Sequence, residues 1–185
     1  MTKTEARKLA KSRRAAVDLH TVGHAMAGVL FTLPAWQHAD TVLAFASMPD
    51  EPDTADILQQ ALAESKRLLL PRVLSRTEMD WVEITALSQL QPGAYGILEA
   101  PASLPAFDTI LLGDGALALI PCLAASPDGV RLGRGGGYYD RFLAHYKGRR
   151  LLVCPTAALL GDLPCEGWDV RFSPHEILTE KGILL

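Results

Sequence analysis

Short apolar runs that alternate with stretches of helical periodicity constrain the fold of this chain more than any other feature of its sequence. Residues 41–46 (TVLAFA) predict a buried strand, and Thr54 predicts the cap of a helix that continues through Glu64. The run 67–70 (RLLL) predicts a second strand, which Pro71 stops. Strands joined through a helix need a crossover connection, so we expect them to be parallel neighbours in a sheet covered by helices.

The rest of the chain continues this alternation. Apolar residues at intervals of three and four predict two helices over residues 3–33, the second ended by Pro34. Further along we expect a strand at 80–84, an ordered loop over 91–106, apolar segments at 109–112 and 117–120, a helix near 138–145 and a strand at 150–154. No repeat or long linker divides the sequence. We therefore predict a single α/β domain over residues 1–185, with three α/β/α layers around a mostly parallel, Rossmann-like open sheet.

Composition excludes several classes of protein. With 185 residues, 49% hydrophobic and 21% charged, the chain has the balance of a globular protein and not of a disordered, collagen-like or coiled-coil one. Its three cysteines share no CxxC spacing, which predicts neither a disulfide framework nor a zinc site and favours a reducing, cytoplasmic location. No signal-peptide pattern and no apolar stretch of about 18 residues occurs, so we expect no membrane insertion.

Charge is unevenly distributed. Eighteen basic and 21 acidic residues give a net charge of -3, too near neutral for a protein whose surface follows nucleic acid. Six of the bases lie in the first 14 residues: Lys3, Arg7, Lys8, Lys11, Arg13 and Arg14. Such a helix could hold a polyanionic small ligand against the domain. Charge alone favours the other interpretation, a solvated terminal helix.

The segment 128–140 (DGVRLGRGGGYYD) has the composition of a phosphate-binding loop. It follows an apolar strand and places glycines at 133, 135, 136 and 137 directly before a predicted helix. Glycine backbone amides can approach a phosphate closely, and a helix N-terminus adds partial positive charge. Arg131 and Arg134 supply bidentate donors, and Asp140 could share a magnesium ion with the phosphates. A surface turn with an acidic residue at a helix N-terminus is the competing interpretation.

These residues form part of a longer resemblance. The run 117–143 (LALIPCLAASPDGVRLGRGGGYYDRFL) resembles the hallmark segment of the 5-formyltetrahydrofolate cyclo-ligase (5,10-methenyltetrahydrofolate synthetase) family. Other elements similar to the family occur on both sides of this run, in the family's order and along nearly the whole chain. They are the pair Lys3 and Arg7, AFASMPDEPDT at 44–54, LLLPRV at 68–73, MDW at 79–81, GAYGILEAP at 93–101 and LPCEGWDVRFSPHEILTEKGI at 163–183.

The resemblance implies a role for each matching residue. It implies ATP binding by Lys3, Arg7, Arg131, Gly133, Arg134, Gly135, Gly136, Gly137 and Tyr138. It implies substrate binding by Met48, Glu51, Trp81 and Tyr139. Arg134 and Tyr139 would also act in catalysis, and Asp140 and Asp169 would hold Mg²⁺.

The same resemblance implies an activity in folate one-carbon metabolism. The formyl oxygen of 5-formyltetrahydrofolate would attack the γ-phosphate of ATP, and N10 would then close the ring, releasing ADP and phosphate. An amide-like oxygen is a weak nucleophile, so alignment and charge stabilisation must supply the catalysis. ATP and 5-formyltetrahydrofolate would be the partners of a cytoplasmic monomer that binds neither nucleic acid nor membranes.

Two departures from the family pattern leave alternatives open. Position 136 is Gly where many members have Lys, and Trp168 stands where His often precedes the last Asp. A catalytically silent module that binds folate or nucleotide is therefore a second hypothesis. An enzyme of sugar phosphates or coenzyme A with a similar sheet is a third, because fold alone does not determine function.

Other candidate residues have simpler explanations. His20 and His24 have the i, i+4 spacing of a zinc pair but no accompanying glutamate motif, which favours a surface helix. Cys122 follows an apolar strand and is expected to be a buried, inert thiol, and Trp36 is expected in the core. Trp81 fits the core as well as a ligand wall. Of Tyr138 and Tyr139, one is expected to face the cleft and the other to pack beneath the sheet.

Overall fold

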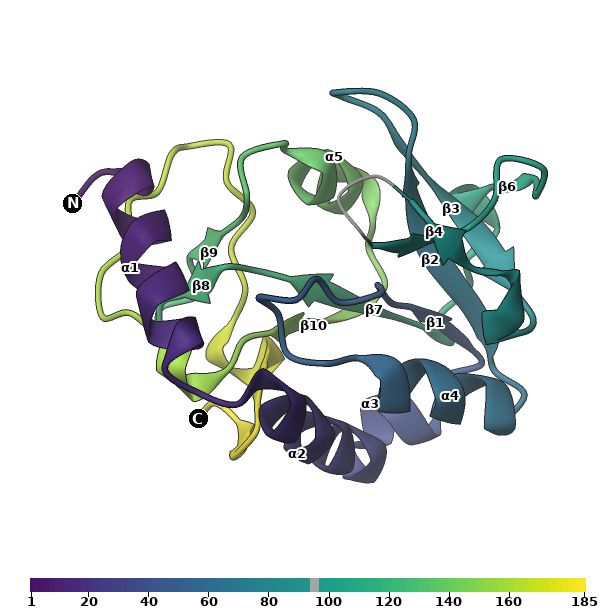
Figure 1. Cartoon of the computed structure of the whole chain (residues 1–185), viewed down its shortest axis with the longest axis horizontal. Helices are drawn as coiled ribbons and strands as arrows, with labels where there is room; N and C mark the ends of the chain where they lie inside the picture. The colour runs from purple at the N-terminus through teal and green to yellow at the C-terminus, as the bar shows by residue number, and fades with distance from the viewer. Residues whose placement is uncertain (94–96) are drawn as a thin grey trace.

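An eight-stranded sheet forms the centre of the protein in the computed structural model, which describes residues 1–93 and 97–185 (Figure 1). Its strand order is β12-β11-β10-β7-β1-β2-β3-β6. The bounds are β1 Thr41–Leu43, β2 Arg67–Val73, β3 Met79–Ile84, β6 Ala106–Phe107, β7 Ala116–Pro121, β10 Arg149–Val153, β11 Ile177–Thr179 and β12 Gly182–Ile183. The five strands from β11 to β2 are parallel, and β12, β3 and β6 join antiparallel at the edges. The predicted mostly parallel α/β sheet is confirmed.

Helices cover both faces of this sheet. Three of them, α2 (Leu19–Thr32), α3 (Pro34–Gln37) and α4 (Ala55–Ala63), lie on one face, and α5 (Tyr138–His145) lies on the other (Figure 1). The remaining helix, α1 (Lys3–Ala15), stands beside the small hairpin of β8 (Ala124–Ala125) and β9 (Arg131–Leu132). The three α/β/α layers expected from the alternating pattern are therefore present.

The alternation of side chains along β7 explains why two hydrophobic cores form. Leu117 and Leu119 pack into the core under α2, α3 and α4, whereas Ala118 and Ile120 pack into the core under α5. Successive residues of a strand point to opposite faces, so an unbroken apolar run supplies both cores at once. Trp36 is buried in the first core and Cys122 in the second, as predicted.

Pro71 does not end its strand as predicted, because β2 continues to Val73. The backbone oxygen of Leu69 accepts a hydrogen bond from the amide of Ala44, so Leu69 points its backbone groups toward β1. Residues two apart in a strand point the same way, and Pro71 therefore faces the side on which β1 has already ended. A missing N–H is tolerated at that position.

Thr54 stands at the N-cap position of α4, but its hydroxyl does not cap the helix. It donates instead to the backbone oxygen of Phe45 over 2.7 Å, while Asp53 Oδ1 accepts from the amide of Ala55 over 2.9 Å. Thr54 thus ties the start of α4 to the residues after β1, and the aspartate before it supplies the helix cap.

Several short elements were not predicted. The sequence pattern did not indicate β11, β12 or the β8–β9 hairpin, and the predicted strand 41–46 is limited to Thr41–Leu43. Within the expected loop over 91–106 lie β4 (Gln91–Pro92) and β5 (Leu98–Glu99). Short 3₁₀ helices span Leu87–Gln89, Thr109–Leu111, Thr156–Ala158 and Pro174–Glu176. Among the described residues, none of the helices has the length and apolar character needed to cross a bilayer.

Candidate active site

A cavity of about 690 Å³ opens at the carboxyl ends of β1, β2 and β7. The chain runs on from β1 to its neighbour β2 on one side and from β7 to its neighbour β10 on the other, so the connections diverge between β1 and β7. Ligands of open α/β sheets bind at such a switch point. Its walls include the acidic turn (residues 47–53), the glycine segment (residues 133–137) and the first turn of α5. Many of the residues singled out in the sequence line it: Met48, Glu51, Arg131, Gly133, Arg134, Gly135, Gly136, Gly137, Tyr138, Tyr139 and Asp140.

The glycine segment owes its path to backbone conformations that other residues rarely adopt. Gly135 has φ 103° and Gly137 has φ 68°, and Gly137 begins α5 without a side-chain cap. The first amides of a helix have no partner within the helix, so an uncapped N-terminus beside a cavity presents donors to an anion. A Cβ at Gly136 would lie 2.6 Å from Cε2 of Tyr138, which is a physical reason for glycine at this position.

Arg131 joins the end of β7 to the start of α5. Its guanidinium donates to the backbone oxygen of Pro121 over 3.1 Å and to Asp140 Oδ1 over 2.7 Å. The side chain is almost fully enclosed, and its Nε has no hydrogen-bond partner among the described residues. Arg131 lines the cavity, so its positive charge is suited to an anionic ligand, although the unpaired Nε is itself enclosed.

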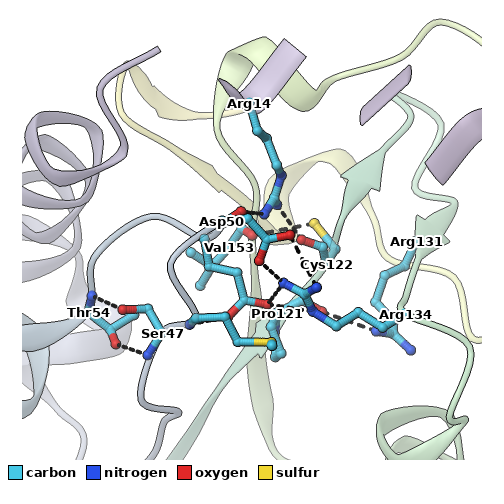
Figure 2. A network of polar contacts seen from close by, with 11 residues as sticks. Arg14, Ser47, Asp50, Thr54, Pro121, Cys122, Arg131, Arg134 and Val153 are labelled. Atoms are coloured by element: carbon cyan, nitrogen blue, oxygen red, sulfur yellow. Dashed lines mark hydrogen bonds and ion pairs between the residues drawn. The ribbon is translucent and has the colours of Figure 1, made fainter. Parts of the chain in front are cut away.

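Arg134 connects the glycine segment to the acidic turn. It donates to Glu51 Oε1 from Nη2 over 3.0 Å and from Nε over 3.2 Å, and it also pairs with Asp50 (Figure 2). Burial opposes the charge of Arg134, but the two carboxylates outweigh it and raise the pKa of the guanidinium. Burial likewise favours the neutral form of Asp50, yet Arg134 holds the pKa of that carboxyl below its ordinary value.

Two of the N-terminal bases contact site elements instead of solvent. Arg7 Nε donates to the backbone oxygen of Gly133 over 3.0 Å, and Lys3 Nζ lies 2.9 Å from Asp169 Oδ2. The helix can approach this closely because small Ala6 and Ala10 are fully buried against the hairpin. Neither Lys3 nor Arg7 is among the residues that line the cavity. Arg7 contacts the glycine segment from behind the lining, and Lys3 contacts the C-terminal loop that carries Glu166 and Asp169.

The two predicted metal ligands each hold a cation of the protein. Asp140 pairs with Arg131, and Asp169 pairs with Lys3. Burial favours protonation of Asp169, but the hydrogen bond from Lys3 and the charge of Arg131 are among the effects that lower its pKa. Among the described residues no three acidic, His or Cys side chains gather as a metal cluster. Magnesium commonly takes one or two carboxylates and completes its shell with phosphates and water. Asp140 lines the cavity and could supply one such carboxylate, whereas Asp169 is not among the lining residues.

Both tyrosines line the cavity, and Tyr139 also packs against the core under α5, so the expected division between the two holds in part. Tyr138 reaches across and donates from its hydroxyl to the backbone oxygen of Ser75 over 2.7 Å. Tyr139 packs edge-on against Trp81 with ring centroids 6.3 Å apart, and burial raises the pKa of its phenol far above the ordinary value.

Trp81 is buried in the core under α5 and does not line this cavity. The side chain stands behind Tyr139, so in this structure it supports the wall and does not form it. His20 and His24 are exposed and pair with Asp53 and Asp56, as a surface helix predicts.

Two residues at the site were not proposed from the sequence. Asp50 holds Arg134, and Arg14 is buried beneath the acidic turn. The sequence did contain a signal for Arg14, because it follows Ala6 and Ala10 at four-residue spacing and so lies on the same helix face. Part of the expected element GAYGILEAP at 93–101 lies outside the described residues, while Ile97, Leu98 and Glu99 line the cavity.

Comparison with known proteins gives consistent results. The sequence profile of the 5-formyltetrahydrofolate cyclo-ligase family matches residues 2–180. A 5-formyltetrahydrofolate cyclo-ligase of Mycolicibacterium smegmatis is 30% identical over 152 residues, covering 78% of this chain and 76% of the relative. The enzyme of that name from Escherichia coli K12 is 30% identical over 154 residues, covering 80% and 84% of the two chains.

Solved structures agree with these sequence matches. The 5,10-methenyltetrahydrofolate synthetase of Aquifex aeolicus superposes with a TM-score of 0.83 at 26% identity and covers all of this chain and 92% of its own. The Mycoplasma pneumoniae protein of that name superposes with a TM-score of 0.74 over 97% of this chain and 99% of its own, and at 20% identity it supports the fold alone.

Proposed function

The chain belongs to the 5-formyltetrahydrofolate cyclo-ligase family, and from that premise we propose that it uses ATP and Mg²⁺ to convert 5-formyltetrahydrofolate into 5,10-methenyltetrahydrofolate. Family membership and the named relatives establish the enzyme class. The cofactor, the mechanism and the role of each residue belong to the proposal, as do a monomeric state and a cytoplasmic location.

A single cavity with two kinds of wall carries the proposal. One part is polar, with the glycine segment, Arg131 and Arg134 around it. The other is apolar, with Phe45, Met48, Leu70 and Met79 among its lining residues. A triphosphate suits the first part and a flat pterin ring suits the second, so the two substrates would meet where these walls adjoin.

In the proposed reaction the formyl oxygen forms a bond to the γ-phosphorus as the bond from that phosphorus to the β–γ bridging oxygen breaks, and ADP leaves. N10 then bonds to the formyl carbon and its proton is lost, while the oxygen departs with the phosphoryl group as inorganic phosphate. Charge accumulates on the phosphoryl oxygens during transfer, and fixed cations stabilise it best in a cavity that excludes water.

Each residue of the polar wall has a part in this scheme. Arg131 is held rigidly by Pro121 and Asp140 and would receive the phosphates without reorganising. Arg134 would leave or share its carboxylates to reach the transferring group. The Tyr139 phenol stays protonated through the range of turnover and could donate to the departing oxygen. Asp140 and Asp169 would hold Mg²⁺, which would supply charge neutralisation for the phosphates when bound.

Gly136 can also be accounted for within this proposal. A lysine there would carry a Cβ that meets the ring of Tyr138, whose hydroxyl is anchored on Ser75. Arg131, Arg134, Lys3 and Arg7 remain to bind phosphate. Glycine in place of the common family lysine at position 136 is therefore compatible with an active enzyme whose loop packs differently.

The direct test is turnover by the purified protein. 5-Formyltetrahydrofolate, ATP and Mg²⁺ should yield the methenyl product, followed by its near-ultraviolet absorbance, together with one ADP for each product formed. Omission of ATP or of Mg²⁺ is the control. Recovery of intact substrate with no ADP would refute the proposal. Calorimetric binding of both substrates under those conditions would instead identify the silent binding module suggested by Gly136 and Trp168.

A further inference from the structure

Arg14 at the end of α1 is a buried arginine that the reaction scheme does not use. Only 1% of the residue is exposed, and no carboxylate lies within ion-pair distance of it among the residues that the structure describes. Its guanidinium donates from Nη1 to the backbone oxygen of Asp50 over 2.7 Å and from Nη2 to the backbone oxygen of Cys122 (Figure 2). A buried charge that satisfies only main-chain oxygens is costly, so a specific purpose is expected of it.

The two carbonyls that Arg14 holds belong to different parts of the cavity wall. Asp50 lies in the acidic turn, directly before Glu51, and Cys122 directly follows β7. Glu51 and Cys122 both line the cavity. The hydrogen bonds of Arg14 therefore set the distance between the acidic turn and the end of the neighbouring strand.

Asp50 is held from two sides by two arginines. Its backbone oxygen accepts from Arg14, and its carboxylate accepts from Arg134 of the glycine segment. The two donors differ in freedom, because Arg134 is about one-third exposed and Arg14 is enclosed. If Arg134 turns toward phosphate, as the proposed function requires, the acidic turn loses one of these two contacts.

We propose that Arg14 is a positioning residue for folate binding: it keeps the acidic turn against the end of β7, so that Glu51 stays on the cavity wall while Arg134 engages ATP. This inference rests on the proposed function for the role of Arg134. Arg14 touches neither substrate and acts through the backbone of Asp50.

The test compares Arg14→Lys with Arg13→Lys, its neighbour on the same helix. Lysine retains the charge but can serve only one of the two carbonyls well, because it lacks the planar fork of a guanidinium. Arg13 is exposed, and within the described part of the chain its side chain donates one hydrogen bond, to the backbone oxygen of Leu159 over 3.3 Å, so its replacement is the matched control. Steady-state kinetics are measured for both substrates, at a temperature well below the unfolding midpoint of each protein.

For Arg14→Lys we expect the KM for 5-formyltetrahydrofolate to rise about tenfold, the scale of one lost charged hydrogen bond, with the KM for ATP changed far less. Arg13→Lys should match the unaltered protein. A purely structural role would lower kcat through loss of folded enzyme and leave both KM values unchanged, and that result would overturn the inference. Equal rises in the two KM values would also overturn it, because they would indicate a general displacement of α1.

A second variant covers the case in which Arg14→Lys does not fold. Asp50→Ala removes the carboxylate that Arg134 holds and leaves the carbonyl that Arg14 holds, so the KM for folate should rise no more than about twofold. A tenfold rise would show that Arg134, and not Arg14, holds the turn. Should the unaltered protein show no turnover, the proposed function fails by itself, and calorimetric affinity for 5-formyltetrahydrofolate then serves as the readout for Arg14.

Discussion

Arg134 and Glu51 join the two halves of the site, with guanidinium Nη2 3.0 Å from carboxylate Oε1. One residue comes from the glycine segment and the other from the acidic turn, 83 positions apart in sequence. Under the proposed function, the cation that would bind phosphate is therefore paired with an acid that would bind folate. Binding of either substrate would then change the surroundings of the other.

Arg134→Lys should lower kcat/KM for ATP by about 10- to 100-fold, because lysine keeps the charge but loses the bidentate geometry. Arg171→Lys is the control, since Arg171 forms an exposed ion pair with Asp128 over 3.3 Å, away from the cavity lining. Initial rates over a range of ATP concentrations measure the effect. Equal kcat/KM values for the two variants would remove Arg134 from the ATP site.

Asp140→Asn should reduce Mg²⁺-dependent turnover about 100-fold or more while the fold is retained, because the amide oxygen still accepts from Arg131 but carries no charge for a metal. Rates measured across a magnesium titration test the first part, and circular dichroism on heating tests the second. Asp128→Asn alters an exposed carboxylate and should leave the titration unchanged. A normal rate for Asp140→Asn at low magnesium would contradict the metal assignment.

Two glycines of α2 should respond to alanine in opposite directions. A Cβ at Gly23 would lie 2.2 Å from the backbone oxygen of Asp53, so Gly23→Ala should lower the free energy of unfolding by about 3 kcal/mol. Apart from the chain neighbours and the backbone of α2 itself, no atom of the described residues lies within 4 Å of a Cβ at Gly28. Gly28→Ala should therefore raise the free energy of unfolding by about 0.5–1 kcal/mol. Urea unfolding of both variants gives the comparison. A stabilising Gly23→Ala would show that α2 and the acidic turn are not in close contact.

His20 should titrate above the ordinary histidine pKa of about 6.5, because Asp53 accepts from its ring nitrogen over 2.8 Å and raises the pKa. Because the pKa of His20 is higher in the folded state than in the unfolded state, the pair stabilises the fold fully below the unfolded-state pKa. This contribution to stability is lost as the pH rises through the raised folded-state pKa. A proton NMR titration of the ring resonances measures this pKa. In Asp53→Asn it should return toward the ordinary value, and an unchanged titration would contradict the ion pair.

The parallel centre of the sheet could be predicted from the sequence because β1, β2, β7 and β10 are apolar runs bounded by turn residues. The small strands were missed for a physical reason. The ladder of β11 and β12 consists of two register pairs, Leu178 with Ile183 and Thr179 with Gly182, too short for any periodicity. The prediction at Pro71 was wrong because a strand tolerates a proline when its nitrogen faces a side with no hydrogen-bonding partner. Whether a partner is there depends on where the neighbouring strand ends, which the local sequence does not show.

The residues around the cavity could be predicted better than their contacts. The glycine segment was predicted to bind phosphate and Met48 and Glu51 to bind substrate, and the two segments that carry these residues do meet. Three contacts depend on how segments far apart in sequence pack against one another. They are the pairing of Arg134 with Glu51, the burial of Arg14, and the position of Trp81 behind Tyr139. Charge count favoured a solvated first helix, whereas the buried face of Ala6 and Ala10 turns some of its bases toward the site.

The pairing of β1 with β7 also limits how the enzyme can move. Leu43 is in register with Ala118, and a slip of one residue would turn every buried side chain of β1 to the wrong face. The acidic turn follows the first of these strands and Cys122 follows the second, so the distance between these two parts of the cavity wall is fixed. The cavity would therefore open for substrate entry and product release through movement of the loops beyond the strand ends. Loop motions occur in nanoseconds to microseconds, which is faster than the rearrangement of whole domains.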